Sequence, residues 1–484
     1  MKVLAFDFGA SSGRAIIGGL ENGKLTLEEV HRFDNEPVYI NGGFHWDLPR
    51  LFHEIKQGLV KAEKYGYESI GIDTWGVDFG LLTKGGYLLG DPYHYRDERT
   101  APVLEAVRKQ IGDGPLYRQT GIQTLAFNSV YQLLATKQND PDVYSVADKM
   151  VLMPDLFSYL LCGEVVAERS IASTTQMLDP ETKEWNLPFL KEVGIDPAIL
   201  PRLVDSGERI GMMKKEICDE LGITPKWITA VCGHDTQSAI VAVPAKDKDF
   251  VYISCGTWSL FGTELDAPCV SDMAVEMDVS NETGYGRTTD FLRNIIGLWM
   301  IQETRRQFRR DGKEYSYAEM EALAREAKPM QCFIDPDEPR FSPPGNQIQR
   351  IRDFCRETGQ YVPETDGEII RCIYESLAMK YAYTFKNLKK CTGKPFSAIH
   401  MVGGGTKDGF LCQMTADATG VPVIAGPIEA TAAGNIAVQL ISAGEIKDLK
   451  EARAIIADSF SVVEYKPQDS GFFRNYDRFC KIVK

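Results

Sequence analysis

The stretch Val3-Leu4-Ala5-Phe6-Asp7-Phe8-Gly9-Ala10-Ser11-Ser12-Gly13-Arg14-Ala15-Ile16-Ile17 decides the fold of this chain. Its apolar run Val3–Phe6 is typical of a strand that is buried on both faces. The small residues Gly9–Gly13 then predict a turn, and Ala15–Ile17 returns to the character of a strand. We therefore expect a β-hairpin whose tip is built from glycine, alanine and serine.

The composition of this hairpin tip suits a phosphate group. Glycines let a backbone approach a phosphate closely, and consecutive N–H groups and hydroxyls can hold its oxygens. Asp7, at the end of the first strand, can position Mg²⁺ directly or through water. An ordinary hairpin turn is the alternative explanation, because an Asp-x-Gly sequence is common on its own.

A similar device recurs about halfway along the chain. Phe250–Ile253 is an apolar run, Ser254-Cys255-Gly256-Thr257 is a small-residue turn, and Trp258–Gly262 resumes as a strand. Two such hairpins suggest a duplicated architecture, and their tips together could hold a polyphosphate. A tight turn without any ligand explains the second tip as well.

The remaining pattern is that of an α/β protein. Apolar runs predict further strands and longer apolar periodicities predict helices, with a boundary between two halves near Pro244–Asp249. The predicted strands are Ser69–Asp73, Trp227–Cys232 and Ala398–Val402, and the predicted helices are Leu48–Lys64 and Glu368–Leu388. The boundary divides the chain into residues 1–246 and 247–484.

Three glycines, Gly403-Gly404-Gly405, follow the strand Ala398–Val402 directly. Without side chains they would let a planar base or a ribose approach the backbone. The spacing matches neither the dinucleotide fingerprint nor the Walker A motif. A glycine-rich turn between a strand and a helix is the alternative reading.

The segment Gly233-His234-Asp235-Thr236 ends another predicted strand. A carboxylate at that place can accept a proton from a substrate hydroxyl as phosphoryl transfer begins. His234 could bond a second hydroxyl, and Thr236 could satisfy the turn. The alternative is that Asp235 or Thr236 caps the helix predicted over Gln237–Val243.

The segment Asp73-Thr74-Trp75-Gly76-Val77-Asp78 has the character of a sugar-binding site. An aromatic face covers the C–H groups of a sugar while polar neighbours bind its hydroxyls. A Trp75 buried in the core explains the same pattern.

Composition narrows the class of protein. The chain has 484 residues and a formal charge of −14, which argues against a partner that is a nucleic acid or an anionic membrane. Neither a signal peptide nor an apolar run of membrane-spanning length is present, so we expect a cytoplasmic protein. The 11 cysteines include no C-x-x-C pair, and this spacing argues against a disulfide framework and against a zinc site.

Taken together, the motifs resemble the FGGY family of carbohydrate kinases, in the actin-like ATPase superfamily, over nearly the whole chain. The resemblance implies an α/β fold of two RNase-H-like domains flanking a catalytic cleft. Residues 1–246 would bind sugar and carry the first phosphate hairpin, and residues 247–484 would bind nucleotide. The matching segments are Asp7–Arg14, Ile72–Phe79, Tyr95–Thr100, Met153–Tyr159, Gly233–Ala239, Ser254–Leu260, Asn294–Trp299 and Val402–Gly405.

Within the family these segments are most similar to the kinases of L-rhamnulose. The resemblance therefore implies transfer of the ATP γ-phosphoryl group to the 1-hydroxyl of L-rhamnulose in L-rhamnose degradation. It implies that Asp235 is the catalytic proton acceptor. Asp7, at the end of its strand, is the candidate ligand of Mg²⁺, and we expect a monomer or small homo-oligomer. The implied sugar contacts are Gly76, His234, Asp235, Thr236 and Asn294, and the implied nucleotide contacts are Ala10, Ser11, Ser12, Gly13, Arg14, Thr257, Gln302 and Gly404.

The chain departs from some relatives at its cysteines. Thr415 and Thr419 stand where those relatives carry a cysteine pair, whereas Cys355 and Cys372 match another paired position. Two other functions stay open. The sugar could be L-fuculose, xylulose or another ketose, and an actin-like fold could serve as a non-catalytic sugar or nucleotide sensor or, less in keeping with the motifs, form filaments.

Overall fold

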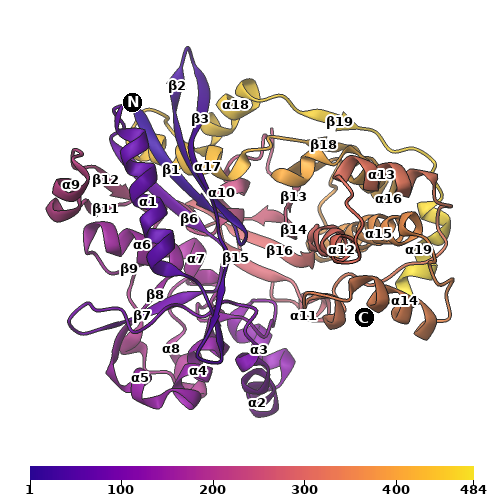
Figure 1. The fold of residues 1–484 in the computed structure, drawn as a ribbon, viewed down its shortest axis with the longest axis horizontal. Coiled ribbons are helices and arrows are strands. Elements are labelled where there is room, and N and C mark those ends of the chain that lie inside the picture. Colours follow the sequence, from indigo (N-terminus) through magenta and orange to yellow (C-terminus); the bar gives the residue numbers. More distant parts are fainter. Residues whose placement is uncertain (484) are drawn as a thin grey trace. The chain divides into compact units, whose positions relative to one another are not determined.

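The fold was analysed in a computed structural model that describes residues 1–483 (Figure 1). Its contacts divide the chain into two compact units, neither of which is continuous in sequence. The first unit comprises Met1–Lys246, Glu264–Phe291 and Ala430–Phe460, and the second comprises Asp247–Thr263, Leu292–Glu429 and the chain from Ser461 onward. Within residues 1–483, no helix combines the length and apolarity needed to cross a lipid bilayer.

A six-stranded sheet organises the first unit, in the order β11-β12-β6-β1-β2-β3. The opening hairpin is formed by β1 and β2, which pair antiparallel, while β1, β6 and β12 run parallel to one another. The strands are β1 (Lys2–Phe8), β2 (Ser12–Glu21), β3 (Lys24–Asp34), β6 (Ser69–Thr74), β11 (Arg209–Met212) and β12 (Trp227–Thr229). The predicted strand Trp227–Cys232 is thus shorter than expected, because its ladder ends at Thr229.

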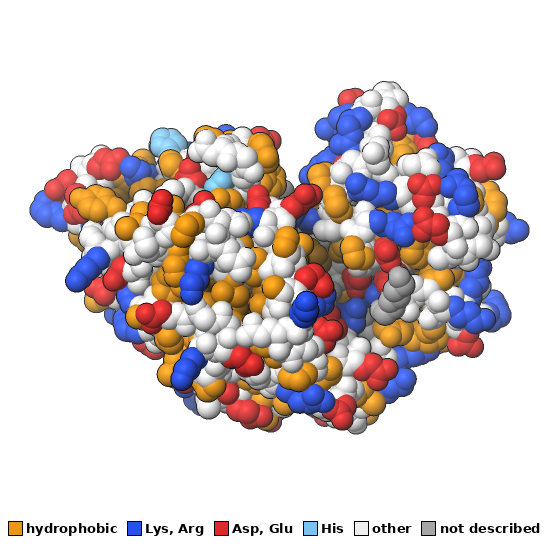
Figure 2. All heavy atoms as spheres, turned by 90° about the horizontal axis from the view of Figure 1, so that it is seen from below, with side chains coloured by type: hydrophobic (Ala, Val, Ile, Leu, Met, Phe, Trp, Pro, Cys, Tyr) orange, Lys and Arg blue, Asp and Glu red, His pale blue; other side chains and the backbone are white. Residues whose placement is uncertain are grey.

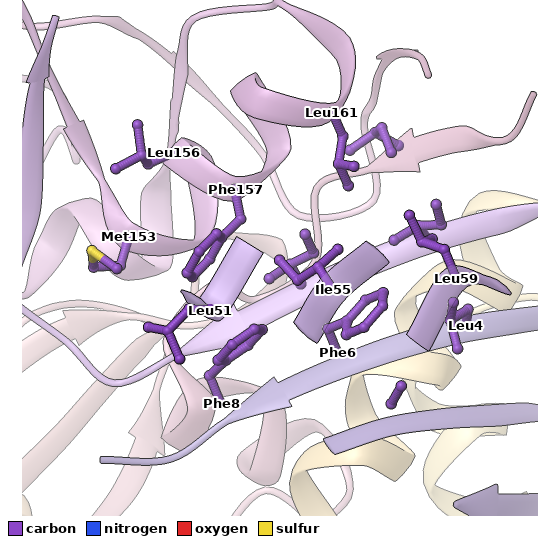
Figure 3. Close-up of a cluster of buried hydrophobic side chains, with 14 of the residues drawn as sticks. Leu4, Phe6, Phe8, Leu51, Ile55, Leu59, Met153, Leu156, Phe157 and Leu161 are labelled. Atoms are coloured by element: carbon purple, nitrogen blue, oxygen red, sulfur yellow. The ribbon is translucent and has the colours of Figure 1, made fainter. Parts of the chain in front are cut away.

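Helices α1 (Leu48–Glu63) and α6 (Met153–Cys162) pack their apolar side chains against β1. Leu51, Ile55 and Leu59 recur every four residues and so form one buried stripe along α1. The rings of Phe8 and Phe157 stack with centroids 4.9 Å apart. Figure 3 shows this cluster, in which the labelled side chains are Leu4, Phe6, Phe8, Leu51, Ile55, Leu59, Met153, Leu156, Phe157 and Leu161.

Helix α17 (Ala430–Ser442) also packs against β1 and β6, and it crosses α10 (Asp235–Val241) closely. Small residues make this close approach possible. A side chain at Gly434 would place its Cβ atom 1.8 Å from the carbonyl oxygen of Ser238. The packing of α17 therefore holds α10, which carries Asp235, firmly in place beside the sheet.

The other elements of the first unit form a helical lobe and connecting strands. Most of the lobe shares a second hydrophobic core, which is separate from the one in Figure 3. These elements are β4 (Val38–Ile40), β5 (Gly43–His45), β7 (Phe79–Thr83), α2 (Ala101–Ile111), α3 (Asp113–Thr120), α4 (Ser129–Asn139), α5 (Pro141–Val146), β8 (Ala147–Leu152), β9 (Val166–Glu168), α7 (Arg169–Ser173), α8 (Leu187–Val193), β10 (Arg202–Val204), α9 (Lys215–Leu221), α11 (Asp272–Met277), β15 (Ser280–Thr283) and α18 (Leu449–Ser459).

The second unit contains neighbouring strands in the order β14-β13-β17-β18-β19, with helices packed around them. The second predicted hairpin is formed by β13 and β14, and β13 runs parallel to β17. Its elements are β13 (Val251–Cys255), α12 (Trp299–Arg310), α13 (Tyr317–Glu326), α14 (Gln347–Glu357), α15 (Asp366–Thr392), β17 (Ile399–Val402), α16 (Gly409–Thr419), β18 (Val423–Ala425), β19 (Val463–Tyr465) and α19 (Phe472–Cys480). It also contains most of β14 (Trp258–Leu265) and of β16 (Thr289–Ile296), whose residues Glu264–Leu265 and Thr289–Phe291 belong to the first unit.

The long helix α15 is defined at both ends by its sequence. Thr365 and Glu368 form a capping box at its N-terminus, and Gly393 ends it with φ of 67°. In its middle the fully buried Lys380 ammonium contacts the carboxylates of Asp335 at 2.7 Å and Asp337 at 2.9 Å. This buried ion pair fixes the loop before α14 onto the helix.

Although the chain has a net charge of −14, its acidic side chains do not form one patch on the face shown in Figure 2. Blue Lys and Arg side chains are interspersed there with red Asp and Glu side chains. That face therefore presents no broad basic surface of the kind that holds nucleic acid.

Candidate functional site

Three aspartates stand at the same edge of the first unit's sheet. Asp7 near the end of β1 lies opposite Asp73 near the end of β6 in the parallel register. Beyond β12, the Thr74 N–H donates to the Gly233 carbonyl oxygen over 2.9 Å, and Thr74 forms a parallel bridge with His234. The next residue, Asp235, begins α10. Parallel strand ends thus place Asp235 at the edge that carries the other two carboxylates.

The surroundings of these carboxyl groups shift their protonation. Burial and the nearby charge of Asp7 raise the pKa of Asp73 well above its ordinary value. Desolvation raises the pKa of Asp235 to about 6, although the charge of His234 opposes the shift. The Asp235 side chain keeps 31% of its exposure, so a ligand can reach it. A carboxylate with this pKa is ionised at neutral pH and still able to accept a proton.

His234 is held by a carboxylate behind it. Its Nδ1 atom lies 2.9 Å from Glu282 Oε2, and its Nε2 atom lies 3.5 Å from Asp235 Oδ1. Burial lowers the pKa of His234, but the Glu282 carboxylate outweighs that effect and raises it. Gln237 Nε2 also donates to Glu282 over 3.0 Å. The imidazole therefore has a fixed orientation beside Asp235.

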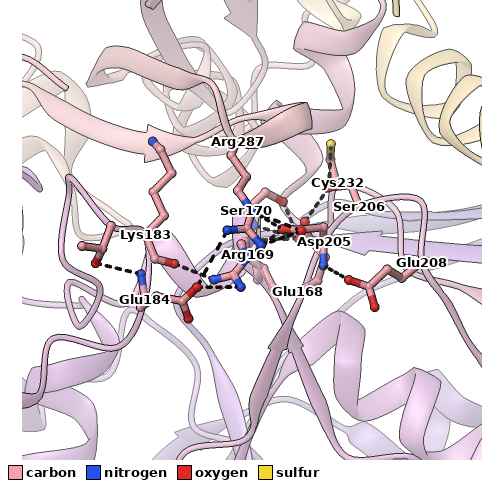
Figure 4. Close-up of polar contacts among 12 residues, drawn as sticks. Glu168, Arg169, Ser170, Lys183, Glu184, Asp205, Ser206, Glu208, Cys232 and Arg287 are labelled. Atoms are coloured by element: carbon pink, nitrogen blue, oxygen red, sulfur yellow. Dashed lines mark hydrogen bonds and ion pairs between the residues drawn. The ribbon is translucent and has the colours of Figure 1, made fainter. Parts of the chain in front are cut away.

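A second buried carboxylate, Glu168, holds the backbone just before His234. Figure 4 labels it together with Ser170 and Ser206, whose hydroxyls donate to it. Glu168 Oε2 accepts hydrogen bonds from the N–H groups of Gly233 at 2.9 Å, Ser170 at 3.0 Å and Ile171 at 3.2 Å, and from the Ser170 hydroxyl at 2.6 Å. Its Oε1 accepts from the Ser206 hydroxyl at 2.6 Å. Sequence reasoning missed Glu168 and Glu282, because neither belongs to a recognisable motif.

The first hairpin tip is braced from the side. The Gly9 N–H donates to the Ser12 carbonyl oxygen over 2.9 Å, and Asn35 Nδ2 donates to the Gly9 carbonyl oxygen over 2.9 Å. Arg14 Nη2 lies 2.5 Å from Asp7 Oδ2. Gly13 has a packing role as well, because a Cβ atom there would meet the Phe33 ring at 2.3 Å. Ala10 and Ser11 complete the tip, where Ser11 is exposed.

Trp75 lies in the core and is not exposed at a ligand surface. It is 5% exposed, and its indole N–H donates to Asp78 Oδ2 over 2.9 Å. The same oxygen accepts from the indole N–H of Trp46 at 2.7 Å. The neighbouring Gly76 packs closely against Thr174, since a Cβ atom added at Gly76 would lie 3.2 Å from the Thr174 side chain. Of the two explanations for Trp75, the structure supports the core residue.

The start of α10 settles the question of capping. The helix begins at Asp235, two residues earlier than predicted, and its N-cap is His234, without a side-chain capping bond. Asp235 Oδ1 accepts from the N–H of its neighbour Thr236 over 2.6 Å, and Thr236 is buried. Neither Asp235 nor Thr236 is the cap residue.

In the second unit, the other predicted residues gather at the ends of β13 and β17. Thr257, at the hairpin tip, has its hydroxyl 3.5 Å from Gln302 Oε1 on α12. Gly403 has φ of 87°, and Gly405 lies so close to Cys255 that a Cβ atom would be 2.2 Å from its sulfur. Gly404 differs from both, because a Cβ atom there would meet nothing within 4 Å. Backbone conformation thus explains Gly403 and packing explains Gly405, whereas of the three only Gly404 presents its backbone to open space.

Asn294, the remaining predicted sugar contact, lies half-buried on β16 in the second unit's part of the chain. Two residues later, the Ile296 N–H donates to Asp337 Oδ1 over 3.0 Å. Arg293 Nη2 lies 3.5 Å from the other oxygen of Asp337. Asp337 therefore supports the strand on both sides of Asn294.

Comparison with known protein families shows which family this chain belongs to. The model of the FGGY family of carbohydrate kinases matches in both parts, its N-terminal domain over residues 2–242 and its C-terminal domain over residues 251–443. The chain belongs to the FGGY family of carbohydrate kinases. This FGGY kinase therefore has the two-domain α/β fold that the resemblance implied.

Curated relatives of this FGGY kinase match it over nearly the full length of both chains. A rhamnulokinase of Bacteroides thetaiotaomicron is 42% identical over 96% of this chain and 96% of its own length. A rhamnulokinase of Bacillus subtilis is 40% identical, over 97% of this chain and 96% of its own length.

Solved structures share the fold at low sequence identity. The xylulose kinase of Lactobacillus acidophilus, solved with a bound ligand, has a TM-score of 0.81 and 18% identity, and covers 99% of this chain and 97% of its own. The glycerol kinase of Plasmodium falciparum, solved with ADP, has a TM-score of 0.77 and 15% identity, and covers 99% of this chain and 97% of its own. These likenesses establish the architecture alone.

The cysteines are all free thiols, including Cys355 and Cys372. Thr415 and Thr419 lie buried on α16, where their hydroxyls donate to the carbonyl oxygens of Leu411 and Thr415, each over 2.7 Å. Both threonine hydroxyls thus bond within the helix itself.

Proposed function

We propose that this FGGY kinase transfers the γ-phosphoryl group of ATP to the 1-hydroxyl of L-rhamnulose, giving L-rhamnulose 1-phosphate in L-rhamnose degradation. The observation that carries the proposal is the full-length similarity to curated rhamnulokinases at 40–42% identity. The ionisable carboxylate of Asp235, reachable from solvent at a strand end, supplies the chemistry that such a transfer needs.

Asp235 is the proposed proton acceptor. Phosphoryl transfer leaves little covalent work for a protein, so catalysis rests on positioning and on charge stabilisation. Asp235 would orient the sugar hydroxyl and take its proton as the new P–O bond forms. His234, fixed by Glu282, would direct a second sugar hydroxyl, and Gly76, Thr236 and Asn294 are the other proposed sugar contacts.

The nucleotide is proposed to contact Ala10, Ser11, Ser12, Gly13, Arg14, Thr257, Gln302 and Gly404. Support comes from the local geometry within each unit. The braced tip after Asp7 presents small residues, and Gly404 has open space before it whereas Gly403 and Gly405 pack against Cys255. Ribose or base can therefore approach the backbone at Gly404.

The residues near Asp7 fit a magnesium ion. The buried Asp73 Oδ1 atom has no hydrogen-bond partner, and the charge of Asp7 raises the pKa of Asp73. A cation nearby would relieve that repulsion. Mg²⁺ keeps several waters and is usually held through one or two carboxylates, so aspartates at this edge of the sheet suit it. When bound, Mg²⁺ neutralises charge on the phosphate oxygens; Asp7 is the proposed ligand, directly or through water.

Replacement of Asp235 by asparagine tests the role of the base. The asparagine side chain would keep the oxygen that accepts the Thr236 N–H and lose the ability to take a proton, so we expect the Asp235→Asn variant to lose roughly 10²–10⁴-fold in kcat. Asp148→Asn is the matched control, because Asp148 is an exposed aspartate of the same unit. A loss in Asp235→Asn of less than about tenfold, with normal folding, contradicts general-base catalysis.

Two alternatives are separated by substrate assays. Another ketose, such as L-fuculose or xylulose, would replace L-rhamnulose as the preferred acceptor in a panel of sugars. A non-catalytic sensor would bind sugar or nucleotide without releasing ADP. Sugar-dependent ADP release that disappears in Asp235→Asn therefore excludes the sensor.

A further inference from the structure

Three cysteine side chains converge in the second unit, far in sequence from any proposed catalytic residue. Cys332 lies in the loop after α13, Cys355 on α14 and Cys372 on α15. Their sulfur atoms all lie within 4.8 Å of one another, and the residues are 2%, 0% and 2% exposed, respectively. Among residues 1–483, no other three His, Cys, Asp or Glu side chains converge in this way.

Hydrogen bonds fix the loop that carries Cys332. The Met330 N–H donates to Glu375 Oε2 over 2.9 Å, the Phe333 N–H donates to Gln360 Oε1 over 2.9 Å, and the Ile334 N–H donates to Ser376 Oγ over 2.9 Å. Two of these acceptors lie on α15, the helix of Cys372. The sulfurs therefore do not depend on a ligand to meet.

The backbone of the other two cysteines is also tied into this region. The Cys355 carbonyl oxygen accepts from the Gln360 N–H over 2.9 Å, and the Cys372 carbonyl oxygen accepts from the Ser376 hydroxyl over 2.5 Å. Gln360 and Ser376 are the same residues that hold the Cys332 loop. One connected set of hydrogen bonds thus positions all three thiols.

The number and the chemical type of these ligands, three sulfur atoms, indicate which metal ion they would bind. A structural zinc ion takes four ligands, and here only three converge. Hard cations such as Mg²⁺ and Ca²⁺ require oxygen ligands, whereas soft thiolates select Cu(I). We propose that Cys332, Cys355 and Cys372 form a three-sulfur binding site for a soft monovalent cation, Cu(I).

Arg478 also holds the loop that carries Cys332. Its guanidinium donates to the carbonyl oxygens of Met330, over 2.8 Å, and of Gln331. Binding forms three Cu–S bonds and releases to solvent the proton of each sulfur that is still a thiol. No electron is transferred, and copper stays Cu(I).

The test uses the complete, fully reduced protein under anaerobic conditions. Cu(I) is titrated in the presence of a competing chromogenic chelator, while ultraviolet absorbance follows the thiolate-to-copper charge-transfer band. We expect the wild type to retain one Cu(I) per chain and to melt at a higher temperature when loaded. The Cys332→Ser variant should bind at least tenfold more weakly. Cys218→Ser is the control, because Cys218 is a buried cysteine of the first unit that belongs to no such cluster among the described residues.

X-ray absorption of the loaded wild type gives a readout that requires no variant to fold. Three sulfur neighbours around copper are the expected result. Nitrogen or oxygen neighbours, or equal affinity in the wild type and Cys332→Ser, would overturn the proposal. A Cys355–Cys372 disulfide that survives strong reductant, detected as a mass 2 Da lower than that of the full set of thiols, would overturn it too, because the third thiol would then have no partners.

Discussion

The buried Glu168 carboxylate offers the sharpest test of how the fold positions Asp235. It accepts hydrogen bonds from three backbone N–H groups, those of Gly233, Ser170 and Ile171, and from two hydroxyls. In a Glu168→Ala variant these three buried N–H groups would lose their acceptor. An unsatisfied buried donor costs about 1–3 kcal/mol, and water entering the space left by the side chain would restore part of that.

We therefore expect Glu168→Ala to lower the free energy of unfolding by about 3–5 kcal/mol. Glu168→Gln keeps one oxygen in the place of Oε2 but loses the charge and puts an NH2 group in the place of Oε1, which accepts from the Ser206 hydroxyl, so about 1–2 kcal/mol is expected. Urea denaturation measures both values. Glu181→Ala is the matched control, since Glu181 is an exposed glutamate of the same unit.

Kinetics distinguish positioning from stability alone. Gly233 directly precedes His234 and Asp235, so a displaced Gly233 should reduce kcat of folded Glu168→Ala about tenfold or more. The KM for ATP should stay within about twofold, because the proposed base does not bind nucleotide, and Glu168→Gln should recover most of the rate. Wild-type stability and kcat in Glu168→Ala, or equal losses in the alanine and glutamine variants, would show that Glu168 does not position Asp235.

Three further predictions follow from single residues. Because Asp235 must be ionised and its pKa is raised to about 6, kcat/KM for the sugar should rise with pH and level off above about pH 6; a flat profile down to pH 5 would contradict this. Gly404→Ala should raise the KM for ATP at an unchanged melting temperature, whereas Gly405→Ala, whose Cβ atom would lie 2.2 Å from the sulfur of Cys255, should lower stability by about 1–3 kcal/mol in thermal unfolding. Burial raises the pKa of Asp78 from 3.8 to about 7, so folding favours the protonated carboxyl group. Between pH 4 and pH 8, the free energy of unfolding of the wild type, measured in urea, should therefore fall by up to about 4 kcal/mol relative to that of Asp78→Asn. A difference between the two proteins that stays constant with pH would exclude this assignment.

The sequence predicted those parts of the fold that depend on local pattern. Both hairpins and the helix α15 are visible as apolar periodicity bounded by small residues or by caps, and these signals lie within a few residues of the elements that they specify. The end of β12 was less predictable. The apolar run continues to Cys232, but the strand stops at Thr229. Beyond it, Ala230 exchanges hydrogen bonds with Gly207 and Glu208, a contact that is distant in sequence and leaves no local signal.

The candidate site was predictable only where a motif carried it. Asp7, Asp235 and Gly404 lie in short patterns with a physical reason for each residue type. Glu168 and Glu282 do not, because their partners lie 65 and 48 residues away in the chain, at Gly233 and His234, respectively. Such long-range contacts are set by packing of the whole unit, and a single glutamate in a short strand gives no local signal of them.

The sugar that this FGGY kinase phosphorylates can be identified in a single assay. ADP release is followed with ATP, Mg²⁺ and each of L-rhamnulose, L-fuculose and xylulose, and the phosphorylated position is read by ³¹P–¹H correlation NMR. We expect kcat/KM to be at least about tenfold higher for L-rhamnulose, corresponding to about 1.4 kcal/mol of transition-state discrimination, with phosphate on the 1-oxygen. Equal or better turnover of another ketose, or phosphate on a different oxygen, would contradict it.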